Sequence, residues 1–188
     1  MDRPPGLRTC LYDTARLEAV IDGMARQAAG LFSGREPLAV VGVLRRGAPL
    51  ADRIADAMVR RYGMPAPLRL DLKVKRYADD LCLLHPETEL REDPSQAALD
   101  LRGYGLLVVD DVLFTGHSLL RVVAHLAERQ PAVIRVAALV DRGAAQLPVR
   151  ADVTGVRLDI APADIIECNV PPYETDFRIE LLQPERGR

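Results

Sequence analysis

Short apolar runs alternate with helical patterns along this chain, and this alternation limits its possible folds most. Leu38–Leu44, Leu106–Val109 and Val133–Val140 consist mainly of apolar residues, which is typical of strands covered on both faces. Residues 13–32 and the segment around Pro49 carry apolar side chains at helical spacing. The order strand, helix, strand predicts an α/β fold with a central parallel sheet and flanking helices.

The weaker patterns complete this expectation of a single domain over residues 1–188. The first helix is expected to have Asp13 or Thr14 as its N-cap. The apolar stripes of this helix and of the helix from Pro49 are expected to be exposed and available to a dimer. Residues 76–104 show no periodicity, and a loop of that length is expected to be a functional lid or locally disordered. Further strands are expected at Leu68–Val74, Val153–Leu158, Ile165–Cys168 and Phe177–Leu182, and a late helix is expected to carry Leu119, Leu120, Val123 and Leu126.

Composition excludes several classes of protein. The net charge of −2 gives no general attraction to nucleic acid or to an anionic membrane. No signal peptide is recognisable, and no stretch approaches 18 uncharged apolar residues, so we expect a cytoplasmic protein without a membrane partner. Cys10, Cys82 and Cys168 lie far apart, and no histidine has metal-ligand spacing, which argues against a structural zinc site or a disulfide framework.

The segment 106–118, LLVVDDVLFTGHS, has the character of a phosphate site. An apolar strand is followed by a turn that opens a helix, and the first turn of a helix offers unpaired N–H groups to an anion. Thr115 and Ser118 add hydroxyl donors, and Gly116 allows the backbone to approach a ligand closely. Ser118 is also a common type of turn or capping residue.

Two adjacent carboxylates, Asp110 and Asp111, precede that turn. They would repel a phosphate, so they suit two neighbouring hydroxyl groups or a nearby cation. Phosphate and vicinal hydroxyls together describe a ribose 5-phosphate. Other phosphate motifs are absent: the chain has no Gly-Lys pair for a Walker A loop, and GYGLLV at 103–108 precedes a strand instead of following one. A phosphorylation receiver would need a late lysine, and no lysine follows Lys75.

The segment 106–118 resembles the 5-phosphoribosyl-1-pyrophosphate (PRPP) motif of type I phosphoribosyltransferases. The likeness extends to the pyrimidine-operon attenuator/uracil phosphoribosyltransferase (PyrR) family and covers most of residues 10–182. It implies the type I fold, with a long flexible loop at about 76–104 and a small C-terminal subdomain, the hood, at about 141–182. The segments that carry it are VVGVLRRGAPLADRIA (40–55), LDLKVKRYADDL (70–81), VVDDVLFTG (108–116) and ALVDRGAAQLPVRADVTG (138–155).

The resemblance also implies roles for individual residues. Asp110 and Asp111 would be catalytic, holding the ribose hydroxyls and stabilising positive charge at the anomeric carbon, with Arg76 at the base of the loop; the roles of Lys73 and Lys75 are left open. Mg²⁺ would be the cofactor, held mainly through PRPP. The residues expected to bind PRPP are Arg45, Arg46, Gly47, Leu113, Phe114, Thr115, Gly116, His117 and Ser118. Those expected to bind the base are Asp141, Arg142, Val156, Arg157 and Leu158.

Three functions follow from the resemblance. The first is an enzyme that makes a nucleoside 5′-monophosphate from PRPP and a nucleobase, with uracil favoured. The second is a catalytically weak PRPP sensor, and the third a nucleotide-sensing, RNA-binding regulator of pyrimidine genes. The third is ranked last, because Ala144-Ala145 replace a His-Arg pair of the family and the net charge is −2. A homodimer or higher homo-oligomer is expected in each case.

Overall fold

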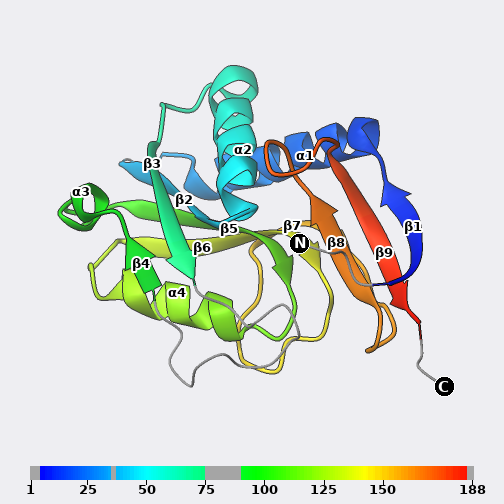
Figure 1. The fold of residues 1–188 in the computed structure, drawn as a ribbon. Helices are drawn as coiled ribbons and strands as arrows, with labels where there is room; N and C mark the ends of the chain where they lie inside the picture. Colours follow the sequence, from blue (N-terminus) through cyan, green and yellow to red (C-terminus); the bar gives the residue numbers. More distant parts are fainter. Residues whose placement is uncertain (1–4, 35–36, 75–89, 186–188) are drawn as a thin grey trace.

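The computed structural model describes residues 5–34, 37–74 and 90–185. Its main sheet has six strands in the order β4-β3-β2-β5-β6-β7 (Figure 1). Five of them run parallel, and β4 pairs antiparallel with β3 at one edge. The predicted parallel α/β sheet is therefore confirmed. The strands are β2 (Leu38–Leu44), β3 (Leu68–Val74), β4 (Leu90–Glu92), β5 (Gly105–Leu113), β6 (Val133–Asp141) and β7 (Val153–Arg157).

Helices cover both faces of this sheet. Figure 1 shows α1 (Thr14–Phe32) and α2 (Gly47–Tyr62) on one face and α4 (His117–Ala127) on the other. The short α3 (Pro94–Ala97) lies beyond β4 in the chain. Asp13 is the N-cap of α1, because its carboxylate accepts a hydrogen bond from the amide N–H of Arg16.

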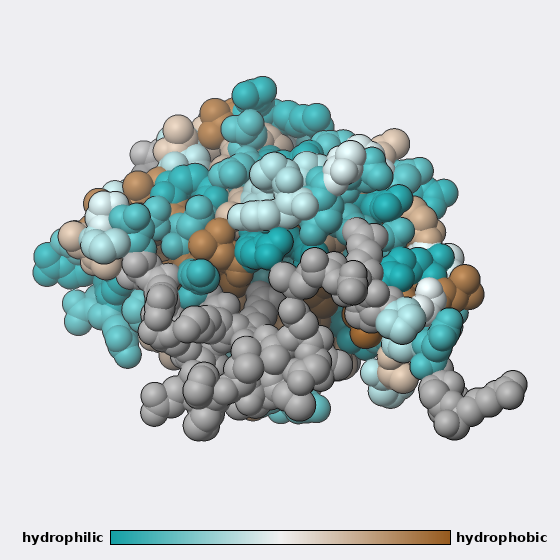
Figure 2. All heavy atoms as spheres, in the orientation of Figure 1, coloured by the Kyte–Doolittle hydropathy of each residue, from teal (hydrophilic) through white to brown (hydrophobic). Residues whose placement is uncertain are grey.

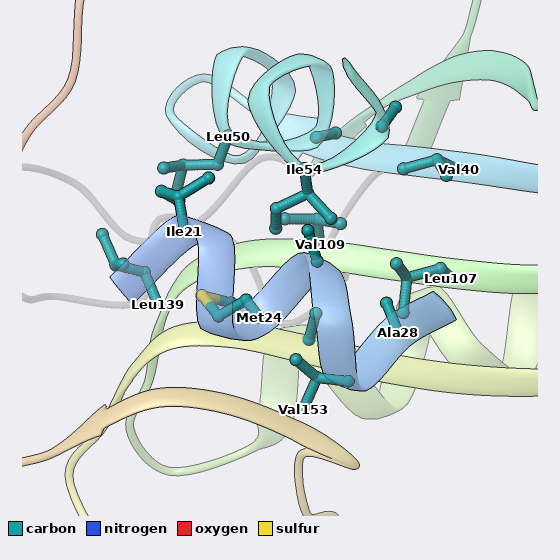
Figure 3. Packing of buried hydrophobic residues seen from close by; sticks show 14 of the residues in the cluster. Ile21, Met24, Ala28, Val40, Leu50, Ile54, Leu107, Val109, Leu139 and Val153 are labelled. Atoms are coloured by element: carbon teal, nitrogen blue, oxygen red, sulfur yellow. The ribbon is translucent and has the colours of Figure 1, made fainter. Parts of the chain in front are cut away.

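The core consists of two hydrophobic clusters, one on each face of the main sheet, because side chains alternate between the two faces along β5. Leu107 and Val109 pack with α1 and α2, and Figure 3 shows Val109 near Ile54 and Leu107 near Ala28. Leu106 and Val108 belong to the opposite cluster, which includes the buried face of α4. Since both faces of β5 are buried, nearly every position in the strand is apolar until its carboxyl end.

The apolar stripes of the first two helices are not exposed, so the expected dimer surface there is wrong. Leu17, Met24 and Leu50 are fully or almost fully buried in the core. On the face seen in Figure 2, the described residues are mainly hydrophilic, with apolar ones scattered in small groups. The predicted stripe of α4 also needs correction, since Val122 is buried while Leu120 is exposed. Among the described helices, none has the length and apolar character needed to cross a bilayer.

A second, antiparallel sheet lies beside the main sheet (Figure 1) and has the order β1-β9-β8. It consists of β1 (Gly6–Tyr12), β8 (Ile165–Asn169) and β9 (Arg178–Pro184). The expected hood at 141–182 therefore differs from this small sheet in two ways. The N-terminal β1, which no pattern predicted, forms one edge of it, and β7 belongs to the main sheet instead.

The expectation of an irregular segment at 76–104 is wrong for its second half. Residues 75–89 lie outside the described part of the chain, but residues 90–104 contain β4 and α3. Polar contacts hold its first part, and Leu101, 1% exposed, packs in the cluster that includes the buried face of α4. Asp93 caps α3, and the side-chain oxygen of Gln96 accepts a hydrogen bond from the amide of Asp71 in β3 at 2.9 Å. Polar contacts and isolated apolar residues leave no hydrophobic period in the sequence.

Candidate active site

The site lies where the winding of the main sheet reverses. The chain passes from β2 outward to β3 on one side, and from β5 through β6 to β7 on the other. In open parallel sheets ligands bind at the carboxyl ends of the strands at such a reversal. Strand β2 is followed there by the Arg45-Arg46-Gly47 turn, and β5 carries Asp110 and Asp111 near its carboxyl end. The fold thus brings together two predicted parts of the site that are more than 60 residues apart in the sequence.

The two acids lie inside β5, not in the turn after it. Asp110 is 5% exposed and Asp111 is 8% exposed. The amide of Asp111 donates to Oδ1 of Asp110 at 2.9 Å, and the amide of Val112 donates to Oδ1 of Asp111 at 3.0 Å. These bonds fix both carboxylates relative to the backbone. Negative charge held in buried surroundings can stabilise a positive charge that develops nearby.

The predicted phosphate turn leads directly from β5 into α4. Gly116, with a φ of 88°, takes the N-cap position of α4, and no side chain caps this helix. The amide of Gln146 donates to the carbonyl of Thr115 at 3.0 Å, and the hydroxyl of Thr115 lies 3.1 Å from Nδ1 of His117. The first turn of α4 therefore presents its N–H groups from a fixed loop, as an anion site requires.

The arginine turn opens α2 in a similar way. Arg46 is the N-cap of α2 with helical backbone angles and makes no side-chain capping bond. By contrast, Asp13 and Asp93 cap α1 and α3 with their carboxylates. Of the four described helices, α2 and α4 lack an acidic cap, and both begin at the site, where an acidic cap would repel a bound anion. The peptide bond between Leu44 and Arg45 is cis.

Both arginines of this turn contact the loop between β8 and β9. The guanidinium of Arg46 forms an ion pair with Glu174, with Nη2 and Oε1 2.6 Å apart. The guanidinium of Arg45 lies over the ring of Tyr173, 5.0 Å from its centre. Burial of Arg46 alone would lower its pKa, but the hydrogen bond to Glu174 and the nearby Asp111 carboxylate raise it above the usual value. Arg46 is therefore charged under all ordinary conditions.

The residues expected to bind the base cluster at the ends of β6 and β7. Oδ1 of Asp141 accepts a hydrogen bond from the amide of Gly143 at 2.8 Å, and the Asp141 carbonyl accepts one from Leu158 at 2.9 Å. Val156 packs its side chain into the core, and Arg157 lies 3.4 Å from Asp159. Leu158 packs against the same cluster as Val156, so these two side chains face the core.

Arg142 connects this group to the phosphate turn. Its amide donates to the carbonyl of Leu113 at 3.0 Å, and its guanidinium lies 4.1 Å from the centre of the Phe114 ring. Nη2 of Arg142 also donates to the carbonyl of Asp164 at 3.1 Å. Burial lowers the pKa of Arg142, and the charge of Asp164 opposes this effect. Phe114 itself is partly exposed and so remains available to a flat ligand.

One predicted site residue lies outside the described part of the chain, and two residues at the site were not predicted from the sequence. Arg76 and Lys75 lie outside the described residues, and Lys73 is exposed on β3. Tyr173 and Glu174 contact the arginine turn but were not predicted, because the segment PPYETD has the composition of an ordinary link between strands. The presence of an aromatic and an acidic residue after two prolines was the available signal, and it is a weak one.

The carboxylates of Asp110 and Asp111 are hard oxygen donors. Within the described ranges, no three His, Cys, Asp or Glu side chains are grouped so that they could cage a metal ion. Mg²⁺ usually binds through one or two carboxylates together with substrate phosphates. The adjacent Asp110 and Asp111 fit such an ion, because they place two carboxylates beside the anion-binding turns. They could therefore hold Mg²⁺ together with a bound phosphorylated ligand.

The sequence and the fold both match known proteins. The profile of the phosphoribosyl transferase domain matches residues 8–175. The bifunctional protein PyrR of Deinococcus radiodurans is 35% identical over 153 residues, which cover 81% of this chain and 82% of that protein. PyrR of Thermus thermophilus is 31% identical over 176 residues, which cover 93% and 96% of the two chains.

Solved structures agree at the level of the fold. Hypoxanthine phosphoribosyltransferase from Trypanosoma cruzi in complex with IMP superposes with a TM-score of 0.75 at 18% identity, covering 98% of each chain. A second structure of the enzyme from that organism has a TM-score of 0.73 at 20% identity, covering 94% of this chain and 97% of that chain. Taken with the sequence matches and the arrangement of Asp110, Asp111 and the two anion-binding turns, these findings show that the chain belongs to the phosphoribosyl transferase domain family, among the relatives of PyrR.

Proposed function

We propose that this phosphoribosyltransferase domain transfers the 5-phosphoribosyl group of PRPP to a nucleobase, that it releases pyrophosphate, and that uracil is its preferred base. One observation carries the proposal. Two helices without acidic caps, α2 and α4, begin on either side of the buried pair Asp110 and Asp111. PRPP has the matching order of groups: a phosphate, a diol and a pyrophosphate.

The chemistry follows from this order of groups. The bond between the anomeric carbon and the pyrophosphate oxygen breaks, and its electron pair leaves with pyrophosphate. The ribose becomes positively charged, and a lone pair on a base nitrogen forms the new bond to the anomeric carbon. The proton of that nitrogen passes to solvent. Asp110 and Asp111 stabilise the positive ribose through their buried charge. Electrostatic stabilisation of this kind is usually the largest contribution of a protein to catalysis.

The remaining groups bind and orient. The turn from Leu113 to Ser118 receives the 5-phosphate at the start of α4, and Arg45, Arg46 and Gly47 receive the pyrophosphate at the start of α2. Mg²⁺, when bound, neutralises part of the charge on the pyrophosphate. The base lies against Phe114 and Arg142, close to the backbone of Asp141 and Leu158.

The decisive experiment is an assay of pyrophosphate release. The protein is incubated with Mg²⁺, PRPP and, one at a time, uracil, cytosine, hypoxanthine, guanine and adenine. We expect release with uracil and formation of UMP. Release with a purine alone would overturn the preference for uracil. Binding of PRPP by calorimetry without turnover of any base would identify a sensor and refute the enzyme.

A second function is motivated by the relatives, whose name describes them as bifunctional. It is nucleotide-dependent binding of RNA in the control of pyrimidine genes. Gel shifts with the leader RNA of the chain's own pyrimidine operon, with and without UMP and over a range of salt, test it. Failure to bind with UMP present would refute it without affecting the enzymatic proposal.

Oligomeric state is a separate proposal: we expect a homodimer or a larger homo-oligomer. The interface would use surfaces other than the buried stripes of α1 and α2. Sedimentation equilibrium of the full chain tests this, and a monomer at micromolar concentration would contradict it.

A further inference from the structure

Both arginines of the Arg45-Arg46-Gly47 turn are held by one short loop of the small sheet. Glu174 contacts Arg46, and its neighbour Tyr173 contacts Arg45. These contacts join segments that are 128 residues apart, and they connect the small sheet to the carboxyl end of β2. A surface ion pair formed by chance would not place two consecutive side chains against two consecutive arginines.

We propose that Glu174 is a positioning residue for the leaving group: it fixes the guanidinium of Arg46 so that its remaining donors meet the pyrophosphate of PRPP. This inference rests on the proposed function, because it needs pyrophosphate to bind at the arginine turn. Glu174 itself does not contact the ligand, since a carboxylate beside pyrophosphate would be repelled.

The hydrogen bonds of Arg46 support this arrangement. Glu174 accepts from Nε at 3.2 Å and 3.3 Å and from Nη2 at 2.6 Å. These two nitrogens form one edge of the planar guanidinium, and two-point binding of this kind sets its plane and direction. These bonds to Glu174 use Nε and Nη2, so Nη1 is left for a further anion. A guanidinium offers five donors in all.

Glu174 is able to act as an anchor because it is fixed from the other side. The amide of Val170 donates to Oε2 of Glu174 at 2.8 Å, and the Glu174 side chain is only 13% exposed. A carboxylate tied to the backbone cannot follow the arginine when a ligand arrives. Arg46 must therefore meet the ligand in the orientation that Glu174 imposes.

Arg45 is held by a cation–π contact with Tyr173, and this contact also leaves its N–H donors available. The Tyr173 ring lies under the face of the guanidinium at 5.0 Å, and a cation–π contact uses the face and not the N–H edge. Arg45 can therefore be held by Tyr173 and still direct its donors at a phosphate. Tyr173 and Glu174 together orient the turn without consuming the donors it needs.

The test is a double-mutant cycle on the full chain, with Mg²⁺-pyrophosphate as the probe and calorimetry as the measurement. The variants are Glu174→Gln, Arg46→Lys and the double variant. We expect Glu174→Gln to weaken pyrophosphate binding about 10-fold, the scale of a lost charge-assisted hydrogen bond. Lysine cannot form the two-point contact, so in the Arg46→Lys background the same change should have almost no effect.

The direction in which Glu174→Gln changes the affinity for pyrophosphate separates the proposal from its alternatives. Removal of a bystander carboxylate near the site would tighten binding of an anion or leave it unchanged. If Glu174→Gln weakened pyrophosphate binding only by disturbing the fold, the same loss of affinity would also be seen in the Arg46→Lys background. Either outcome overturns the proposal. If Glu174→Gln does not fold, Glu174→Asp keeps the charge but shortens the reach, and it should show a smaller loss in the same direction.

Glu167→Gln is the matched control. Glu167 forms a comparable two-point pair with Arg8 in the same small sheet, at 2.9 Å and 3.1 Å, and this pair joins β8 to β1 and not to the arginine turn. This variant should bind pyrophosphate like the wild type. If the wild type binds neither pyrophosphate nor PRPP, the proposed function fails. If the wild type binds both ligands and Glu174→Gln binds pyrophosphate with the same affinity as the wild type, only the positioning role fails.

Discussion

Gly47 and Val109 lie so close together that a Cβ on Gly47 would overlap the carbonyl oxygen of Val109 and lie 3.3 Å from the Cα of Asp110. The start of α2 therefore packs directly on the strand that carries the acids. Only a residue without a side chain allows the two halves of the site to approach this closely.

Gly47→Ala should for this reason displace the arginine turn from β5. We expect a loss of about 1–3 kcal/mol in the free energy of unfolding, as for other overpacked positions, and a fall in turnover that exceeds the fraction of protein unfolded. Urea titration and pyrophosphate release measure the two effects. Gly30→Ala in α1 is the control, because a Cβ there meets nothing within 4 Å. It should stabilise the protein by up to about 1 kcal/mol and leave turnover unchanged. Equal effects of both variants would contradict the close-approach argument.

The acids of β5 should contribute through their charge. Asp110→Asn and Asp111→Asn keep the size of the side chain but remove the negative charge that stabilises the positive ribose. We expect kcat to fall by about 100-fold or more in each, the scale seen when preorganised electrostatic groups are removed. Steady-state assays with PRPP and the preferred base measure this, and circular dichroism checks the fold. Turnover and PRPP affinity that stay at wild-type values in the doubly substituted chain would refute the assigned role.

The ion pair of Glu174 predicts a pH dependence of stability. Burial would raise the pKa of the Glu174 carboxyl, but hydrogen bonds from Arg46 and from the amide of Val170 outweigh this and lower it below the usual 4.5. A carboxyl whose pKa is lower in the folded state stabilises the protein at pH values above the unfolded pKa. That contribution is lost as the pH falls through the folded pKa.

The stability difference between wild type and Glu174→Gln should therefore be constant at neutral pH and shrink only below the usual glutamate pKa of 4.5. Urea titrations at a series of pH values measure it. A difference that already changes between neutral pH and mildly acidic pH would show that another group is responsible.

The cysteines should differ sharply in reactivity. Cys10 is exposed on β1, whereas Cys168 is buried in β8 with its Sγ 4.0 Å from the carbonyl oxygen of Asp111. Burial, reinforced by the Asp111 carboxylate, raises the pKa of the Cys168 thiol well above its usual value. Alkylation depends on the thiolate and on access.

Iodoacetamide at mildly alkaline pH should thus modify Cys10 and leave Cys168 intact, as followed by peptide mapping. Both should react after denaturation in guanidinium, which is the control. Modification of Cys168 at the rate of Cys10 in the folded protein would mean that β8 opens readily from the main body.

The sequence revealed the parallel sheet because burial on both faces makes its strands continuously apolar. Leu38–Leu44 was predicted with its observed bounds. The acids and the turn after β5 were also predicted, because the types and spacing of these residues fit one ligand. The reversal of strand order then explains why they lie beside Gly47, which no local pattern could show.

Contacts between distant polar residues escaped sequence reasoning. The pair of Arg46 and Glu174 depends on a fold that returns β8 to the end of β2, and each residue taken alone resembles a solvated charge. The pairing of β1 with β9 was missed for a different reason: no residue of β1 is fully buried, so the strand has no strong apolar face. The order in the second half of the predicted loop was missed because hydrogen bonds, such as that from Asp71 to Gln96, leave no periodic signal in the sequence.

The order β1-β9-β8 has a consequence for biosynthesis. Strand β9 is the central member of the small sheet and follows both of its partners in the chain, so β1 and β8 have no common partner until β9 emerges from the ribosome. A nascent chain can complete all the parallel strands while this sheet is still unformed. The small sheet can therefore form only once β9 has been made, because β9 is the strand that joins β1 to β8.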